Sequence, residues 1–175
     1  MIFNITQTIR YIGVDDTDLD LFESQYIVPN GISYNSYLIM DEKVAIMDTV
    51  DLRKSEDWWD NLNIALNGRT PDYLVVQHME PDHAGNIAAA LEKFPTLKVV
   101  ASARAIQMLP QFFENTDFEG RTIAVKEGET LNLGKQTFFV LVLTRRAGNR
   151  FQNLSKCLLG QISEIFLQRG RIHFI

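Results

Sequence analysis

The sequence predicts one domain that mixes β-strands with α-helices. The N-terminal third consists mostly of short strand-like runs, and a β-α-β pattern follows from residue 71 onward. The chain has 175 residues, 46% of them hydrophobic, which is enough for one domain with a core and too short for two full domains. We therefore expect a single hydrophobic core.

A hairpin and a helix are predicted in the first part of the chain. The apolar runs at 35–40 and 44–50 are separated by the charged turn "DEK", a pattern typical of a β-hairpin. The stretch 55–66 places Trp58, Trp59, Leu62 and Leu66 near one face of a helix, with Ser55 as its expected N-cap.

The second part of the chain predicts a β-α-β unit followed by a further helix and more strands. A buried strand at 71–77, a helix at 86–94 that Pro95 ends, and a second buried strand at 97–102 form this unit. The next segments are a helix at 103–113 with a break before Pro110, and strands within 121–143 separated by Gly128 and Gly134.

Composition excludes several classes of protein. The chain has 17 Lys and Arg against 22 Asp and Glu, a net charge of -5. It contains no block of basic residues, so a nucleic acid or an anionic membrane is not expected as a partner. No apolar run approaches the length of a membrane span, and the N-terminus does not resemble a secretion signal. The single cysteine, Cys157, excludes an internal disulfide. We expect a cytoplasmic protein.

The stretch "VVQHMEPDHAGN", residues 75–86, contains two of the three histidines. Because side chains alternate along a strand, His78 and Glu80 point the same way, and Pro81 then turns the chain so that Asp82 and His83 begin the next helix. Imidazole and carboxylate donors together suit zinc, manganese or non-haem iron, and two carboxylates favour iron. The pattern predicts a metal site at a strand-to-helix junction.

Each residue of this stretch also has an interpretation that involves no metal. Asp82 is a suitable N-cap for the following helix, and His78 is a candidate for a hydrogen-bonded core histidine. Glu80 favours the metal, because a carboxylate beside a buried strand is costly unless it is paired or bound to a cation.

The phrase His-x-Glu-x-Asp-His resembles the metal motif of the flavodiiron proteins, or A-type flavoproteins. The family's metal domain has the metallo-β-lactamase fold, and hydrolases of that fold usually carry histidine where this chain has Glu80. The phrases that resemble the family, in order, are "YIGVDDTDLDLFESQY", "GISYNSYLI", "DEKVAIMDTVD", "PDYLVVQHMEPDHAGN" and "EGETLNLG". The resemblance covers roughly residues 10 to 143. It implies an α+β fold, the metallo-β-lactamase-like αββα sandwich, with its first half present.

The resemblance also implies chemistry. A non-haem diiron site would reduce dioxygen to water or nitric oxide to nitrous oxide, with His78 and Glu80 on one iron and Asp82 and His83 on the other. Zinc is an alternative metal. Asp48 either supports the ligands from behind or merely ends a strand. Electrons would come from FMN, supplied by a donor such as rubredoxin or a flavin protein, and the family forms homodimers.

Two departures from the family bear on activity. We expect this chain to lack the flavodoxin-like FMN domain, and no counterparts of the family's later ligands follow residue 143; His173 has no ligand-like context. We therefore expect a partial metallo-β-lactamase-like domain at 1–143, a divergent tail at 144–175, weak metal binding and negligible turnover by this chain. The alternatives are a hydrolase of the metallo-β-lactamase fold and a metal-free remnant.

The tail differs in composition from the rest of the chain. Arginines stand at 145, 146, 150, 169 and 171, against positions 10, 53, 69, 104 and 121 in the preceding residues. One interpretation is a basic amphipathic helix over 154–166. The other is a frameshift near Thr144: one encoding of the family phrase Phe-Ser-Ala-Asp-Ala-Phe, shifted by one base, translates to the "QRGRI" of residues 168–172. The gene translated in all three forward frames decides between them.

Overall fold

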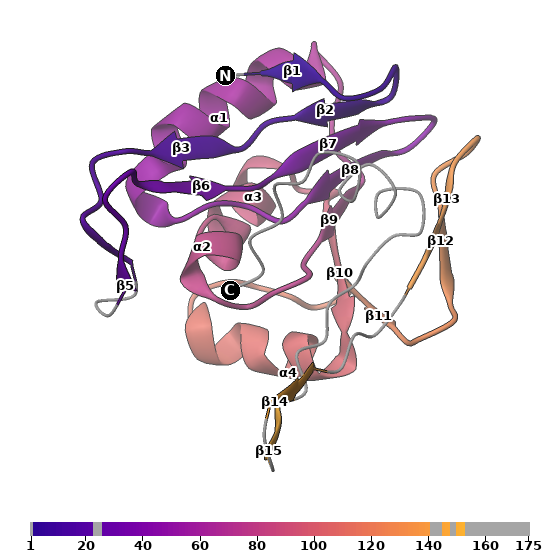
Figure 1. Cartoon of the computed structure of the whole chain (residues 1–175). Coiled ribbons are helices and arrows are strands. Elements are labelled where there is room, and N and C mark those ends of the chain that lie inside the picture. The colour runs from indigo at the N-terminus through magenta and orange to yellow at the C-terminus, as the bar shows by residue number, and fades with distance from the viewer. Residues whose placement is uncertain (1, 23–25, 141–144, 148–149, 153–175) are drawn as a thin grey trace.

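A mixed seven-stranded β-sheet with helices against one face forms the centre of the molecule (Figure 1). This computed structural model describes residues 2–22, 26–140, 145–147 and 150–152. The helices are η1 (Leu52–Lys54, a 3-10 turn), α1 (Ser55–Leu66), α2 (Pro81–Ala84), α3 (Ile87–Lys93) and α4 (Ala103–Phe112).

The strands of the main sheet follow the order β1-β2-β7-β8-β9-β10-β11. Their bounds are β1 Phe3–Asn4, β2 Ile9–Tyr11, β7 Tyr37–Met40, β8 Val44–Met47, β9 Tyr73–Val75, β10 Lys98–Ser102 and β11 Thr122–Val125. Neighbours are antiparallel from β1 to β8 and parallel from β8 to β11. The predicted hairpin (β7 and β8) and the predicted β-α-β unit (β9, α3 and β10) are both confirmed.

The remaining strands form four small two-stranded pairings. They are β3 (Val14–Asp16) with β6 (Ile32–Tyr34), β4 (Leu21–Phe22) with β5 (Tyr26–Ile27), β12 (Thr130–Asn132) with β13 (Thr137–Phe139), and β14 (Arg145–Ala147) with β15 (Arg150–Gln152). Gly134, between β12 and β13, has a φ of 125°, a conformation that favours glycine over residues with a side chain.

Alternation along the central strands divides the core between the two faces of the sheet. Leu38, Ile46 and Leu74 belong to the cluster that packs against α1, α3 and α4. Their neighbours Ile39 and Val75 belong to a second cluster, which includes residues of the β12–β13 hairpin. This two-sided burial follows from the period of two in a strand and explains the nearly continuous apolar runs.

Two expectations about helix ends are wrong. Ser55 does not cap α1: the chain enters this helix from η1, so the Ser55 hydroxyl instead donates to the Leu52 carbonyl at 2.8 Å. Helix α4 also does not break before Pro110 but continues to Phe112. Pro110 lies in the last helical turn, where its missing N–H removes one hydrogen bond and only two helical residues follow it.

The tail is described only in part. The β14–β15 hairpin is not a member of the seven-stranded sheet. The helix expected over 154–166, the "QRGRI" segment, Cys157 and His173 all lie outside the described residues. In the portion of the chain that is described, no helix combines the length and the apolar character needed to cross a membrane.

Replacing Leu62 with alanine should strongly destabilise the fold. Leu62 is fully buried on the inner face of α1, so the substitution leaves a cavity and should lower the free energy of unfolding by about 2–5 kcal/mol. Chemical denaturation monitored by circular dichroism measures the change. The matched control is Ile64→Ala on the same helix, where the side chain is 69% exposed and the expected change is small. Equal losses in both variants would contradict the position of α1.

Candidate metal centre

The candidate site lies where β8 and β9 end and α2 begins (Figure 1). Because β8 and β9 are parallel neighbours, their carboxyl ends meet at the same edge of the sheet. Asp48 follows β8 directly, and the segment after β9 carries His78 and Glu80 before α2 starts. The carboxyl edge of parallel strands is where α/β proteins commonly bind ligands.

The four predicted ligands form two imidazole–carboxylate pairs. His78 Nε2 lies 3.5 Å from Glu80 Oε1, and His83 Nε2 lies 3.3 Å from Asp82 Oδ2. The two histidine rings are 5.6 Å apart between centroids. Glu80 has a half-exposed side chain, whereas the side chains of His78 and Asp82 are each 16% exposed. The junction therefore brings all four side chains to one region, in two pairs.

Asp48 is not one of the four predicted ligands, but its carboxylate orients His83. Its carboxylate is buried and accepts the backbone N–H of Gln77 at 2.7 Å and the Gln77 side-chain amide at 3.2 Å. The same carboxylate lies 3.2 Å from Nδ1 of His83. A carboxylate on one ring nitrogen orients a histidine and leaves the other nitrogen, here Nε2, for a metal or a proton.

The backbone at Asp48 is unusual. Its φ is 55°, in the left-handed region, which costs a residue with a side chain about 1–3 kcal/mol. The turn is clamped by the next residue, since the Thr49 N–H and hydroxyl both donate to the His83 carbonyl, at 2.7 and 2.9 Å. These bonds join the end of β8 to helix α2.

A glycine and a buried asparagine complete the contact between the two segments. A Cβ added to Gly85 would lie 2.7 Å from the Val50 carbonyl oxygen, closer than a real contact permits. The Asn86 side chain donates to the same carbonyl at 2.9 Å, and the Asn86 N–H donates to the Thr49 hydroxyl at 3.1 Å. Close backbone approach therefore requires glycine at position 85.

The donor spacing in each pair suits a cation. Two ligands with bonds of about 2.1 Å to one ion lie roughly 3.0 to 3.4 Å apart, close to the separations within the His78–Glu80 and Asp82–His83 pairs. Among the described residues, no group of three or more His, Cys, Asp or Glu side chains is arranged to hold one ion. Within the described residues, each pair therefore brings two potential donors together, and no third donor joins either pair.

Protons compete with metal at both histidines. Burial lowers the pKa of His83, but its hydrogen bond to Asp48 and the charges of Asp48, Asp82 and Glu80 outweigh this and raise the pKa to about 9. At His78, Nδ1 accepts the Glu80 N–H at 3.2 Å, so the neutral ring carries its proton on Nε2. A cation on Nε2 of His83 must displace a proton, and a cation on Nε2 of His78 requires the other tautomer, with the proton on Nδ1 and without the bond from the Glu80 N–H.

The metal-free interpretations of individual residues agree with their positions to different degrees. Asp82 is not an N-cap, because Glu80 holds the N-cap position of α2, Pro81 follows at the first helical position, and no side chain caps the end. His78 has a side chain that is 16% exposed and accepts a hydrogen bond from the Glu80 N–H, so it is mostly buried but not fully enclosed in the core. Asp48 does end a strand, and it also supports His83, so its two interpretations hold together.

Sequence reasoning missed Gln77, Thr49 and Asn86. All three flank the motif or follow Asp48, but a neutral polar residue next to a strand carries no signal of its own. Only the pairing of β8 with β9 shows that they bond across the junction.

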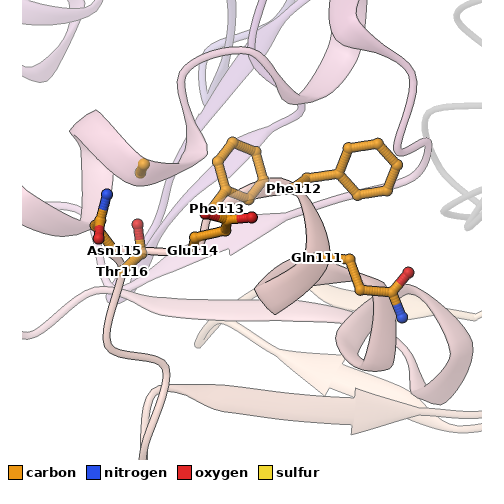
Figure 2. A pocket seen from close by; sticks show the side chains of 7 residues that line it. Gln111, Phe112, Phe113, Glu114, Asn115 and Thr116 are labelled. Atoms are coloured by element: carbon orange, nitrogen blue, oxygen red, sulfur yellow. The ribbon is translucent and has the colours of Figure 1, made fainter.

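A second surface feature is separate from this junction. An open depression of about 380 Å³ is lined by Ala88, Gln111, Phe112, Phe113, Glu114, Asn115 and Thr116 (Figure 2). Figure 2 shows Phe112 and Phe113 at the end of α4, and Phe112 is 59% exposed. None of the four candidate ligands lines this depression, so it does not extend the site.

Known proteins resemble the chain in sequence. A flavorubredoxin from Vibrio vulnificus, described as an anaerobic nitric oxide reductase, is 30% identical over 141 residues, which are 80% of this chain and 28% of the relative. A diflavin flavoprotein from Synechocystis is 37% identical over 131 residues, or 75% of this chain and 22% of the relative. No protein-family model matches. The chain thus spans under a third of the length of these relatives.

Solved structures resemble it as well. The rubredoxin oxygen:oxidoreductase of Desulfovibrio gigas superimposes with a TM-score of 0.74 at 31% identity, covering 79% of this chain and 34% of that one. The flavodiiron protein of Giardia intestinalis gives a TM-score of 0.71 at 24% identity, over 81% of this chain and 34% of that one, which supports the fold alone.

The fold is therefore that of a metallo-β-lactamase-like domain, of which the described residues form part. Within that class the chain belongs to the flavodiiron proteins, as the motif at residues 78–83 and the relatives agree. The resemblance noted in the sequence is confirmed.

The stability of the metal-free protein should depend on the Asp48–His83 pair. The pKa of His83 is raised from 6.5 to about 9, so the charged His83 ring stabilises the folded state. This contribution to the free energy of unfolding is fully present below pH 6.5 and is lost as the pH rises through 9. In Asp48→Asn, which keeps the side-chain shape and tolerates the left-handed backbone, this loss should be much smaller. Thermal unfolding in chelator across this range measures the difference. Parallel stability curves for the two proteins would contradict the pairing.

Proposed function

We propose that this chain carries metal-binding residues of an oxidoreductase that reduces dioxygen to water or nitric oxide to nitrous oxide. The observation that carries the proposal is the pair of imidazole–carboxylate contacts, at 3.5 and 3.3 Å, on one strand-to-helix junction. The names of the relatives support the same chemistry, since they include a nitric oxide reductase and a rubredoxin oxygen:oxidoreductase.

Each residue has a distinct part in the proposal. His78 and Glu80 hold one iron, and Asp82 and His83 hold the other. Non-haem iron, when bound, supplies the centre at which the gas is bound and reduced with electrons from a flavin. The Asp48 carboxylate accepts a hydrogen bond from Nδ1–H of His83, which directs Nε2 toward the ion. The two hydrogen bonds from Gln77 keep this carboxylate in place.

The proposal also concerns the limits of this chain. Two donors per ion give weaker binding than three or four protein ligands, so water fills the open positions and turnover by this chain is negligible. The partial domain extends over 1–143, with the divergent tail after it. An FMN domain or a rubredoxin donor comes from outside these residues, and the working protein is a cytoplasmic homodimer. Zinc can replace iron in the same donor set.

Titration with Co²⁺, a spectroscopic substitute for Fe²⁺, should show two ions bound per chain, with affinity at the site of Asp82 and His83 that increases as the pH rises toward the His83 pKa of about 9. Glu80→Gln should weaken one site by about tenfold or more, and Asp82→Asn should weaken the other by a similar factor. Glu80 is half-exposed, so its substitution should leave the fold unchanged. Isothermal titration calorimetry and visible absorption measure the stoichiometry and the affinities.

The matched control is Glu92→Gln, an exposed glutamate on α3 that should leave both sites unchanged. Equal effects of Glu80→Gln and Asp82→Asn on one shared ion would contradict the assignment of separate ions. Failure to bind any metal would support the metal-free alternative, and hydrolysis of a generic ester or thioester by the loaded protein would support the hydrolase. Oxygen or nitric oxide consumption by this chain with a flavin donor would refute the expected inactivity.

A further inference from the structure

A buried chain of hydrogen bonds leads from helix α1 to the junction. The indole N–H of Trp58 donates to the hydroxyl of Ser36 at 3.0 Å, and that hydroxyl donates to the backbone carbonyl of Asp48 at 2.9 Å. Trp58 and Ser36 are both fully buried. An indole N–H can only donate and a carbonyl oxygen can only accept, so the direction of both bonds is fixed.

The chain of hydrogen bonds ends on the backbone of Asp48, whose conformation depends on contacts with other segments. Among the described residues, only Asp48 and Asn67 have a positive φ without being glycine. Asn67 follows the end of α1, where a left-handed residue is common. Asp48 instead follows a strand, so its conformation depends on contacts from elsewhere. Its N–H donates to the Val75 carbonyl at 2.9 Å, and its own carbonyl accepts the Ser36 hydroxyl.

The two bonds also reinforce each other. A hydroxyl that accepts a hydrogen bond becomes a stronger donor, so the Trp58 bond strengthens the one from Ser36 to Asp48. The direction of the Asp48 carbonyl and the direction of its carboxylate are coupled through one Cα. A peptide plane held by Ser36 therefore helps to aim the carboxylate at Gln77 and His83.

We propose that Ser36 and Trp58 are positioning residues for the metal centre, which act through the left-handed backbone of Asp48 on the orientation of His83. The inference rests on the proposed metal site for its functional meaning. Neither residue touches a candidate ligand. They determine where the Asp48 carboxylate lies, and the carboxylate determines which nitrogen of His83 is free for the ion.

The first test needs no metal. In Ser36→Ala, the backbone amide of Gln77, which donates to Asp48 at 2.7 Å, should shift upfield in the proton NMR spectrum and exchange faster with solvent than its neighbours. The control is Ser102→Ala, which removes the cap of α4 and destabilises the protein without contacting Asp48. Trp58→Phe, which removes the first bond together with part of a buried ring but keeps the Ser36 hydroxyl, should give a smaller shift of the same sign.

The second test measures metal affinity in a double-mutant cycle. Ser36→Ala should weaken Zn²⁺ binding at the site of Asp82 and His83 by up to about tenfold and leave the site of His78 and Glu80 nearly unchanged. In an Asp48→Asn background the same substitution should have almost no further effect, because the route through the carboxylate is already lost.

The outcomes separate the two proposals. If wild-type protein binds no metal but the Gln77 amide responds to Ser36→Ala and not to Ser102→Ala, the positioning role stands and the proposed function fails. If metal binds but Ser36→Ala changes only the unfolding midpoint, leaving the amide and both affinities unchanged, the positioning role is overturned. Additive losses from Ser36→Ala and Asp48→Asn would also overturn it, since they would show independent action.

Discussion

The buried carboxylate of Asp48 is the constraint on which the junction depends. A buried charge must have partners, and here they come from the segment after β9, through Gln77, and from helix α2, through His83. The parallel pairing of β8 with β9 brings these partners within reach. The sheet register and the orientation of a candidate ligand are therefore consequences of one arrangement.

Short elements make this arrangement possible. Helix α2 has only one turn, so its own backbone hydrogen bonds hold it weakly. Its position instead comes from the Thr49 bonds to the His83 carbonyl and from the close approach of Gly85 to Val50. The junction is thus fixed by contacts between segments, while the large core behind it holds the sheet and the longer helices in place.

The sequence predicted the elements of this fold better than their contacts. Apolar runs and turn residues located the hairpin of β7 and β8 and the unit of β9, α3 and β10, because burial imposes a strong period on a sequence. The bounds of α1 were predicted correctly, but its N-cap and the effect of Pro110 were mispredicted, since both depend on neighbouring turns. The motif placed His78 and His83 at the junction, but the backbone of Asp48 and the bonds of Ser36 depend on strand pairing, which spacing along the chain does not reveal.

The close approach at Gly85 has a consequence for protein engineering. A designer who transplanted only His78 to His83 onto another β-α junction would carry over the donors without the surface that fixes their helix. The transplant would also need the left-handed turn at Asp48, the peptide carbonyl of Val50 and a glycine facing it. The smallest portable unit is two strand ends with their turns, which lie about thirty positions apart in the chain.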